Sequence, residues 1–188
     1  MNILRQLCLA TALAVAVVAP GVVAVFEPAN AATPDEINKD AELALQKLYK
    51  ANPVAEQISR TAKAVLIFPS ILKAGLLIGG SYGDGVLKEG NRVVDYYTSF
   101  SASWGLQVGA QTYGYALFLM NDTAIEYINK SDGWEIGVGP SVVVVDEGMA
   151  RRMTTTTLRD DAYAFIFNQS GLMGGLGMEG TKITKTKR

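Results

Sequence analysis

Basic side chains gather in two places where they could contact an anionic surface. One group follows Glu179, the last acid of the chain, and the other surrounds residues 153–158. The candidate lipid-binding residues are Lys182, Lys185, Lys187, Arg188, Arg151, Arg152 and Arg159. Each basic residue near an anionic membrane contributes about 1 kcal/mol, so a few together would hold a protein weakly on such a surface. The competing interpretation is that they are ordinary solvated charges.

Side chains suited to catalysis are scarce. The sequence has no histidine and a single cysteine, Cys8, which excludes Ser-His-Asp and Cys-His nucleophiles and histidine-containing zinc sites. The G-x-x-x-x-G-K-[ST] loop that cradles nucleotide phosphates is also missing. A carboxylate enzyme using Asp84, Asp146 or Glu179 stays open as an alternative, although these acids are expected at strand ends or turns. We therefore expect no enzyme, no cofactor and no metal.

The charge balance argues against nucleic acid as a partner. The 17 basic and 18 acidic residues nearly cancel and leave a net charge of −1. No global field would therefore attract the chain to a phosphate backbone.

The N-terminal segment has the pattern of a secretory signal peptide. Arg5 gives a short positive region, and an apolar stretch follows over residues 7–19. Residues 29–31 (ANA) place small side chains where a signal peptidase reads them, which predicts cleavage before Ala32. The alternative is an uncleaved membrane anchor over residues 7–25. Cleavage implies an exported protein of the bacterial periplasm or envelope, and it would remove the only thiol.

Residues 32–188 are expected to form a single domain that begins with helices over residues 33–61. Thr33 and Glu36 have the spacing of a capping box, and Pro34 suits the first helical position. Apolar residues then recur on one face, and Asn52–Pro53 ends this helix and caps a short second one. This face is expected to pack on the core; the alternative is a membrane interface.

The pattern changes to strands over residues 63–188. Runs rich in β-branched and aromatic residues alternate with glycines, and a second capping-box pattern at Thr123–Glu126 predicts one short helix among them. Seven or more strands after a helical start predict an α+β fold. In it, N-terminal helices pack on a curled or barrel-like antiparallel β-sheet. The glycines of residues 79–85 are expected to be structural, at bulges, corners or close backbone approaches.

Several motifs follow one another in a defined order: residues 65–69 (VLIFP), 79–85 (GGSYGDG), 139–146 (GPSVVVVD), 162–167 (AYAFIF), 171–172 (GL) and 176–180 (LGMEG). In this order they resemble the SYLF domain family, over about the whole of residues 32–188. Eukaryotic members couple phosphoinositide membranes to actin, whereas bacterial members are exported proteins described as lipid-binding. For an exported bacterial chain the resemblance implies phospholipid binding, and its mostly glycine and apolar motifs name no binding residue.

Three functional hypotheses follow from different classes. The first is a lipid-binding module that contacts a phospholipid membrane surface or holds a lipid inside the domain. The second is a structural or partner-binding envelope protein with an apolar surface patch. The third is the carboxylate enzyme.

Overall fold

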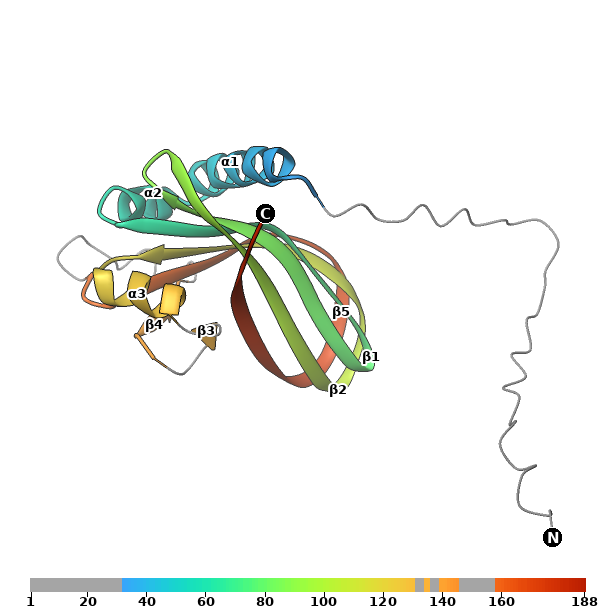
Figure 1. Ribbon diagram of the computed structural model, residues 1–188. Helices are drawn as coiled ribbons and strands as arrows, with labels where there is room; N and C mark the ends of the chain where they lie inside the picture. The colour runs from blue at the N-terminus through green and yellow to red at the C-terminus, as the bar shows by residue number, and fades with distance from the viewer. Residues whose placement is uncertain (1–31, 131–133, 136–138, 146–157) are drawn as a thin grey trace, which may run out of the picture. The chain divides into compact units, whose positions relative to one another are not determined.

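Three long strands carry the fold of the protein, whose computed structural model describes residues 32–188 except 131–133, 136–138 and 146–157 (Figure 1). β1 (Ala64–Glu89) and β2 (Arg92–Leu119) form a hairpin, and β5 (Ala162–Thr186) lies on the other side of β2. The predicted signal peptide, residues 1–31, lies outside the described residues.

The sheet is antiparallel along its main path, β1-β2-β5-β3, where β3 is Trp134–Glu135. β4 (Val142–Val144) pairs with β5 in parallel, so the sheet is mixed. The predicted α+β fold with helices on a curled sheet is confirmed. The expectation of seven or more strands is wrong among the described residues, because glycines inside β2, such as Gly105 and Gly109, bend the strand without ending it.

Each long strand curls so strongly that its two halves face one another (Figure 1). In β1 the two halves approach at the glycines of the 79–85 segment. A Cβ atom at Gly85 would lie 2.5 Å from the carbonyl oxygen of Ile67, and one at Gly79 would lie 2.8 Å from that of Ala74. Only a residue without a side chain allows such contact. The segment has the structural role predicted from the sequence.

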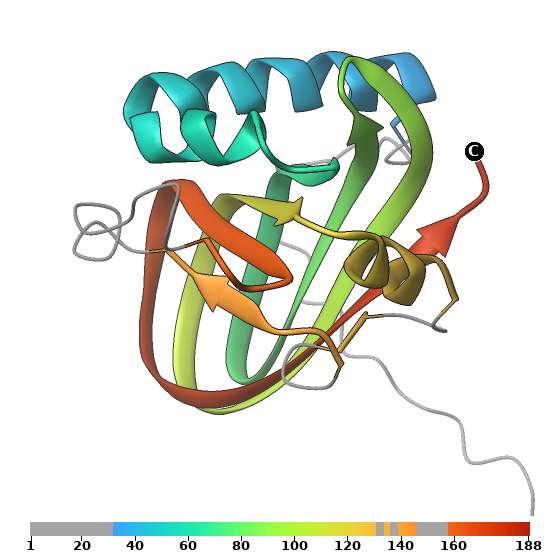
Figure 2. The same cartoon turned by 90° about the vertical axis from the view of Figure 1, so that its left-hand side faces the viewer.

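Helices α1 (Pro34–Ala51) and α2 (Pro53–Ser59) lie across one end of the outer face of the curl (Figure 2). The predicted capping box is present: the Thr33 hydroxyl accepts from the backbone N–H of Glu36, whose carboxylate accepts from the backbone N–H of Thr33. Buried side chains of both helices pack against outward-facing residues such as Phe118 and Phe165. This contact forms one of two apolar cores.

The second core lies inside the curl. It contains Leu66, Phe68, Leu117 and Leu119 from the strands, and α3 (Asp122–Lys130) adds Ala124 and Ile128. The predicted short helix is confirmed, but Asn121 is its cap, because its side-chain oxygen accepts from the Ala124 N–H at 2.9 Å. Within the described residues, no helix is long and apolar enough to cross a membrane.

Candidate functional site

A large part of the outer face of the sheet is apolar and has no helix over it. The residues concerned, here called the apolar outer face, are Leu72, Leu76, Ile78, Tyr82, Phe100, Trp104, Val108 and Leu172. Ile78 is 78% exposed, Trp104 63% and Leu172 89%. Apolar side chains concentrated on one face mark a surface that binds something, whereas single exposed apolar residues are ordinary.

The register of the strands explains why these side chains share a face. All eight occupy even-numbered positions, and the pairing keeps even positions together: Ile78 lies opposite Trp104, and Leu76 lies opposite Val108. Successive side chains of a strand point to opposite faces, so the odd-numbered neighbours point inward. Behind this part of the face the inward-facing residues include serines, and Ser81, Ser101 and Ser103 are almost fully buried.

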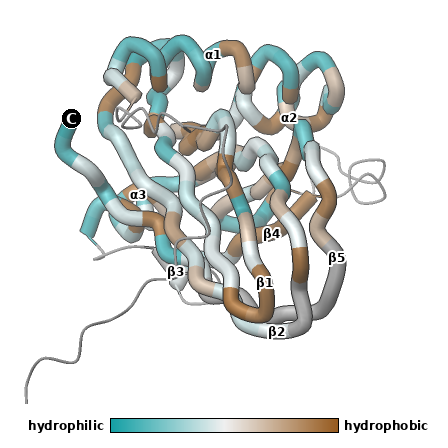
Figure 3. The backbone as a smooth tube through the Cα atoms, turned by 90° about the vertical axis from the view of Figure 1, so that its right-hand side faces the viewer, coloured by the Kyte–Doolittle hydropathy of each residue, from teal (hydrophilic) through white to brown (hydrophobic). Residues whose placement is uncertain are grey.

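The polarity of this part of the sheet is therefore inverted. Serines lie inside, where Ser81 and Ser101 share a hydrogen bond of 2.6 Å between their hydroxyls. Aromatic and aliphatic residues lie outside, against solvent. Figure 3 shows the hydrophobic colour gathering on β1 at the end of the curl remote from α1 and α2. An inverted pattern is stable when the outer face meets an apolar partner.

The strands bend at this same end of the curl. Leu77 is bulged between the paired residues Leu76 and Ile78, and its φ of 68° is left-handed, a conformation that non-glycine residues rarely adopt. Gly109 and Gly171, in β2 and β5, also have positive φ. Leu77 is 57% exposed, so the bend presents a further apolar side chain to solvent. We refer to Leu76, Leu77 and Leu172 as the apolar tip.

Among the predicted lipid-binding residues, Lys182 lies within the apolar outer face. It is exposed and pairs with Phe100, which in turn pairs with Tyr82, so one cation and two aromatic rings form a row across three strands. The other predicted basic residues after Glu179 lie further along the chain: Lys185 is in β5, and Lys187 and Arg188 follow it. Lys187 is exposed, whereas Lys185 is in an ion pair with Asp95 at 2.6 Å.

Arg188 is held in a cluster around Asp84. One guanidinium nitrogen is 2.6 Å from an Asp84 carboxylate oxygen, and both side chains are about 15% exposed. The hydroxyls of Tyr82 and Thr98 donate to the other oxygen of Asp84. Partial burial and the contact with Asp84 raise the pKa of Tyr82. Asp84, a candidate for carboxylate catalysis, is thus engaged by Arg188, Tyr82 and Thr98.

The remaining candidates are not brought together with this face. Arg159 is exposed just before β5, while Arg151 and Arg152 lie outside the described residues. Of the other candidate acids, Asp146 lies outside them as well, and Glu179 is placed only by its backbone pairing with Ser103.

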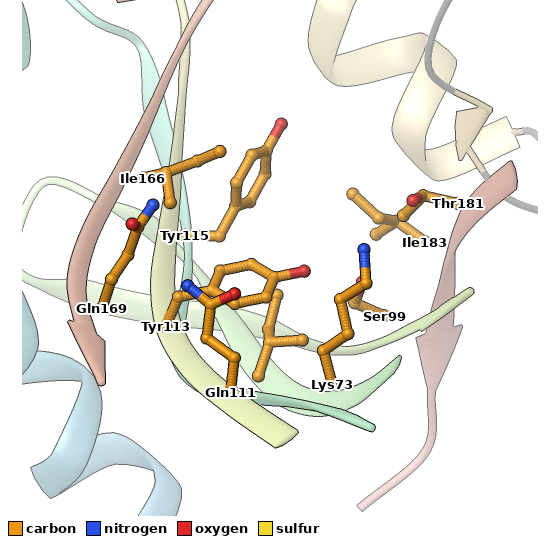
Figure 4. A pocket seen from close by; sticks show the side chains of 10 residues that line it. Lys73, Ser99, Gln111, Tyr113, Tyr115, Ile166, Gln169, Thr181 and Ile183 are labelled. Atoms are coloured by element: carbon orange, nitrogen blue, oxygen red, sulfur yellow. The ribbon is translucent and has the colours of Figure 1, made fainter. Parts of the chain in front are cut away.

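The inner face encloses a hollow that the sequence did not reveal. It has a volume of about 280 Å³. Its lining is Ile71, Lys73, Ser99, Gln111, Tyr113, Tyr115, Ile166, Gln169, Thr181 and Ile183. Figure 4 shows Ile166 and Gln169 on one side and Thr181 and Ile183 on the other, all four from β5. The curl that brings these distant positions together has no signature in a local sequence pattern.

Residues 100–188 match a family model, Ysc84, described as Las17-binding protein actin regulator. The matched residues include all of β5 and the part of β2 that carries Phe100, Trp104 and Tyr115. No curated protein gives a significant match.

The fold and its exposed apolar face define an α+β binding domain built on one curled sheet. The match confirms the resemblance seen in the sequence: residues 100–188 are similar to the SYLF domain family, the family of the Ysc84 model. This similarity indicates membrane binding or partner binding.

Proposed function

We propose that the protein is a non-enzymatic, exported envelope protein that docks on a phospholipid membrane through its apolar outer face. The observation that carries the proposal is the row of Tyr82, Phe100 and Lys182 beside the exposed pair Ile78 and Trp104. Tryptophan and tyrosine favour the membrane–water interface, where the ring meets acyl chains and the polar edge meets headgroups.

The energetics support a reversible peripheral contact. Full burial of one large apolar side chain contributes about 1.5–3 kcal/mol, and partial insertion contributes less. Lys182 adds about 1 kcal/mol on an anionic surface, and exposed Lys187 adds a similar amount if it reaches the headgroups. Since ordering the protein on the surface opposes these gains, several side chains must act together.

The experiment is sedimentation with vesicles, using protein expressed from its full sequence. Anionic and zwitterionic vesicles are compared at low and high salt. We expect pelleting with anionic vesicles, weakened by salt and by Lys182→Gln. The reference variant is Lys63→Gln, since Lys63 is exposed but forms an ion pair with Asp122 away from this face. Failure to pellet with either vesicle type would refute the membrane proposal.

The second candidate is docking of a protein partner on the same apolar face, and the description of the matching family model, which names a binding protein, favours it. Two results together would favour this candidate over the membrane. The parent protein would capture one defined envelope protein but bind no vesicles, and Trp104→Ser would lose that capture.

Export has its own test. Intact mass of the protein recovered from the periplasmic fraction of a bacterial host should correspond to a chain that begins at Ala32. Recovery only from the cytoplasm at full length would contradict the proposed localisation.

A further inference from the structure

Two hydroxyl groups that line the hollow have no hydrogen-bond partner among the residues that the structure describes. They belong to Ser99, 2% exposed, and Tyr115, 7% exposed. A hydroxyl that faces a hollow without a protein partner is available to donate a hydrogen bond to a ligand. Burial raises the pKa of Tyr115 far above its usual value, so this hydroxyl keeps its proton and can donate.

The other polar groups around the hollow are also mostly able to donate. Gln111 and Gln169 carry amides, Thr181 carries a hydroxyl, and Lys73 carries an ammonium group. Figure 4 shows these side chains converging from β1, β2 and both halves of β5. The complement of such a lining is a group that accepts several hydrogen bonds and carries negative charge.

The remaining lining is apolar. Ile71, Ile166 and Ile183 contribute aliphatic side chains, and Tyr113 and Tyr115 contribute the faces of their rings. A site of this kind binds a molecule with an apolar body and few polar atoms. The volume of about 280 Å³ is near the lower end for ligand pockets, which suits one chain rather than the two acyl chains of a phospholipid.

We infer that the hollow is a binding site for one single-chain amphiphile with an anionic head, a carboxylate or a phosphate monoester. The head accepts hydrogen bonds from Ser99 and Tyr115 near Lys73, and the chain lies against the isoleucines. This site is on the opposite face of the sheet from the proposed membrane contact and does not depend on it.

The test is isothermal titration calorimetry with protein expressed from its full sequence, at probe concentrations below micelle formation. The probes are dodecanoate, dodecyl phosphate and neutral dodecyl maltoside. We expect binding of at least one anionic probe, and the tighter of the two identifies the head as carboxylate or phosphate. Equal binding of the neutral probe, or no heat with any probe at the highest concentration below its micelle formation, would overturn the inference.

Two variants remove one donor each while keeping the shape of the hollow: Tyr115→Phe and Ser99→Ala. Each should weaken binding of the anionic probe about tenfold, the loss of one charge-assisted hydrogen bond. Neither substitution should lower the melting temperature of the free protein, since each removes a hydroxyl that has no hydrogen-bond partner among the described residues. The matched control is Tyr82→Phe, because that hydroxyl lies on the outer face and donates to Asp84.

A crossed comparison separates this site from the membrane contact. Trp104→Ser should weaken vesicle binding and leave affinity for the anionic probe unchanged, whereas Tyr115→Phe should leave vesicle binding unchanged and weaken binding of the probe. Unchanged probe affinity in both Tyr115→Phe and Ser99→Ala would place the probe elsewhere and refute the assignment.

Discussion

Ile78 on β1 and Trp104 on β2 lie directly opposite each other, and both side chains point into solvent while Ser101 and Ser103 are buried behind them. A cross-strand pair of this size usually stabilises a sheet by packing against the core. Here the pair is turned outward, so its apolar surface is available to a membrane.

The double variant Ile78→Ser/Trp104→Ser should weaken binding to anionic vesicles by tenfold or more, because two large apolar side chains are lost from the contact. Thermal stability should stay the same, since both side chains are exposed. Vesicle sedimentation and thermal unfolding measure the two effects. Leu43→Ser is the matched control, because Leu43 is a half-exposed leucine on α1, away from the apolar outer face. An equal loss in the control would contradict the assignment of the face.

Leu77 offers a way to separate binding from folding. Its left-handed backbone destabilises the fold by about 1 kcal/mol, and glycine relieves this strain while losing a similar amount of chain entropy. Leu77→Gly should therefore leave the free energy of unfolding nearly unchanged and weaken vesicle binding several-fold. Urea unfolding and sedimentation are the measurements. A large loss of stability would show that the Leu77 side chain supports the fold and is no contact residue.

The ion pair of Asp84 with Arg188 should contribute measurably to stability. Asp84→Asn leaves a mostly buried guanidinium without its anion, which should lower the free energy of unfolding by about 3 kcal/mol. In a double-mutant cycle with Arg188→Gln, the second substitution should cause little further loss. Additive losses would mean that the two side chains act independently.

Gly85 should tolerate no side chain. In Gly85→Ala the new methyl group would lie 2.5 Å from both the Ile67 carbonyl oxygen and the Phe68 ring, and displacing them should destabilise the fold by about 2–3 kcal/mol. Gly90→Asn is the control. Gly90 has a φ of 58° and open space around it, and asparagine tolerates that conformation. Urea unfolding measures the stability of both variants. If Gly85→Ala were as stable as Gly90→Asn, the two halves of β1 would separate readily.

The pair of Glu42 with Lys88 predicts a pH dependence. A hydrogen bond from Lys88 lowers the pKa of Glu42 below its usual value. A carboxyl with a lowered pKa stabilises the fold above its unfolded pKa of about 4.3, and this contribution disappears as pH falls through the folded value. Glu42→Gln should thus be less stable than the parent at pH 7, with the difference vanishing near pH 2–3. Urea midpoints across this range measure it.

Glu56→Gln is the control for this pH series. Glu56 pairs with Arg60 on the exposed face of α2, where such a pair contributes well under about 1 kcal/mol. A pH profile of the same size in both variants would assign the effect to general charge rather than to Lys88.

Local patterns in the sequence predicted the helices and the class of the fold. The capping box at Thr33, the cap at Asn52 and the switch to strand periodicity are short-range signals, and each corresponds to an element of the structure. The number of strands was wrong because a glycine ends a strand or bends it depending on distant contacts. In β2, pairing on both sides carries the strand through its glycines.

The candidate site was predicted only in part. Charge alone identified Lys182 but equally favoured Lys185 and Arg188, whose anionic partners, Asp95 and Asp84, are about ninety residues or more away in sequence. The alternation of serine with aromatic residues over 99–104 was visible as a strand. The sequence did not show which of the two faces points into the fold, since periodicity shows that the faces differ but not which one is buried.

The curl has a mechanical consequence. Both walls of the hollow are halves of the same strands, so no hinge between separate sheets exists within the described residues to let it open. Any change in its width must be taken up where the strands bend, at Leu77, Gly109 and Gly171. These positions adjoin the apolar tip. A displacement of the tip and a change in the width of the hollow would therefore involve the same backbone torsions.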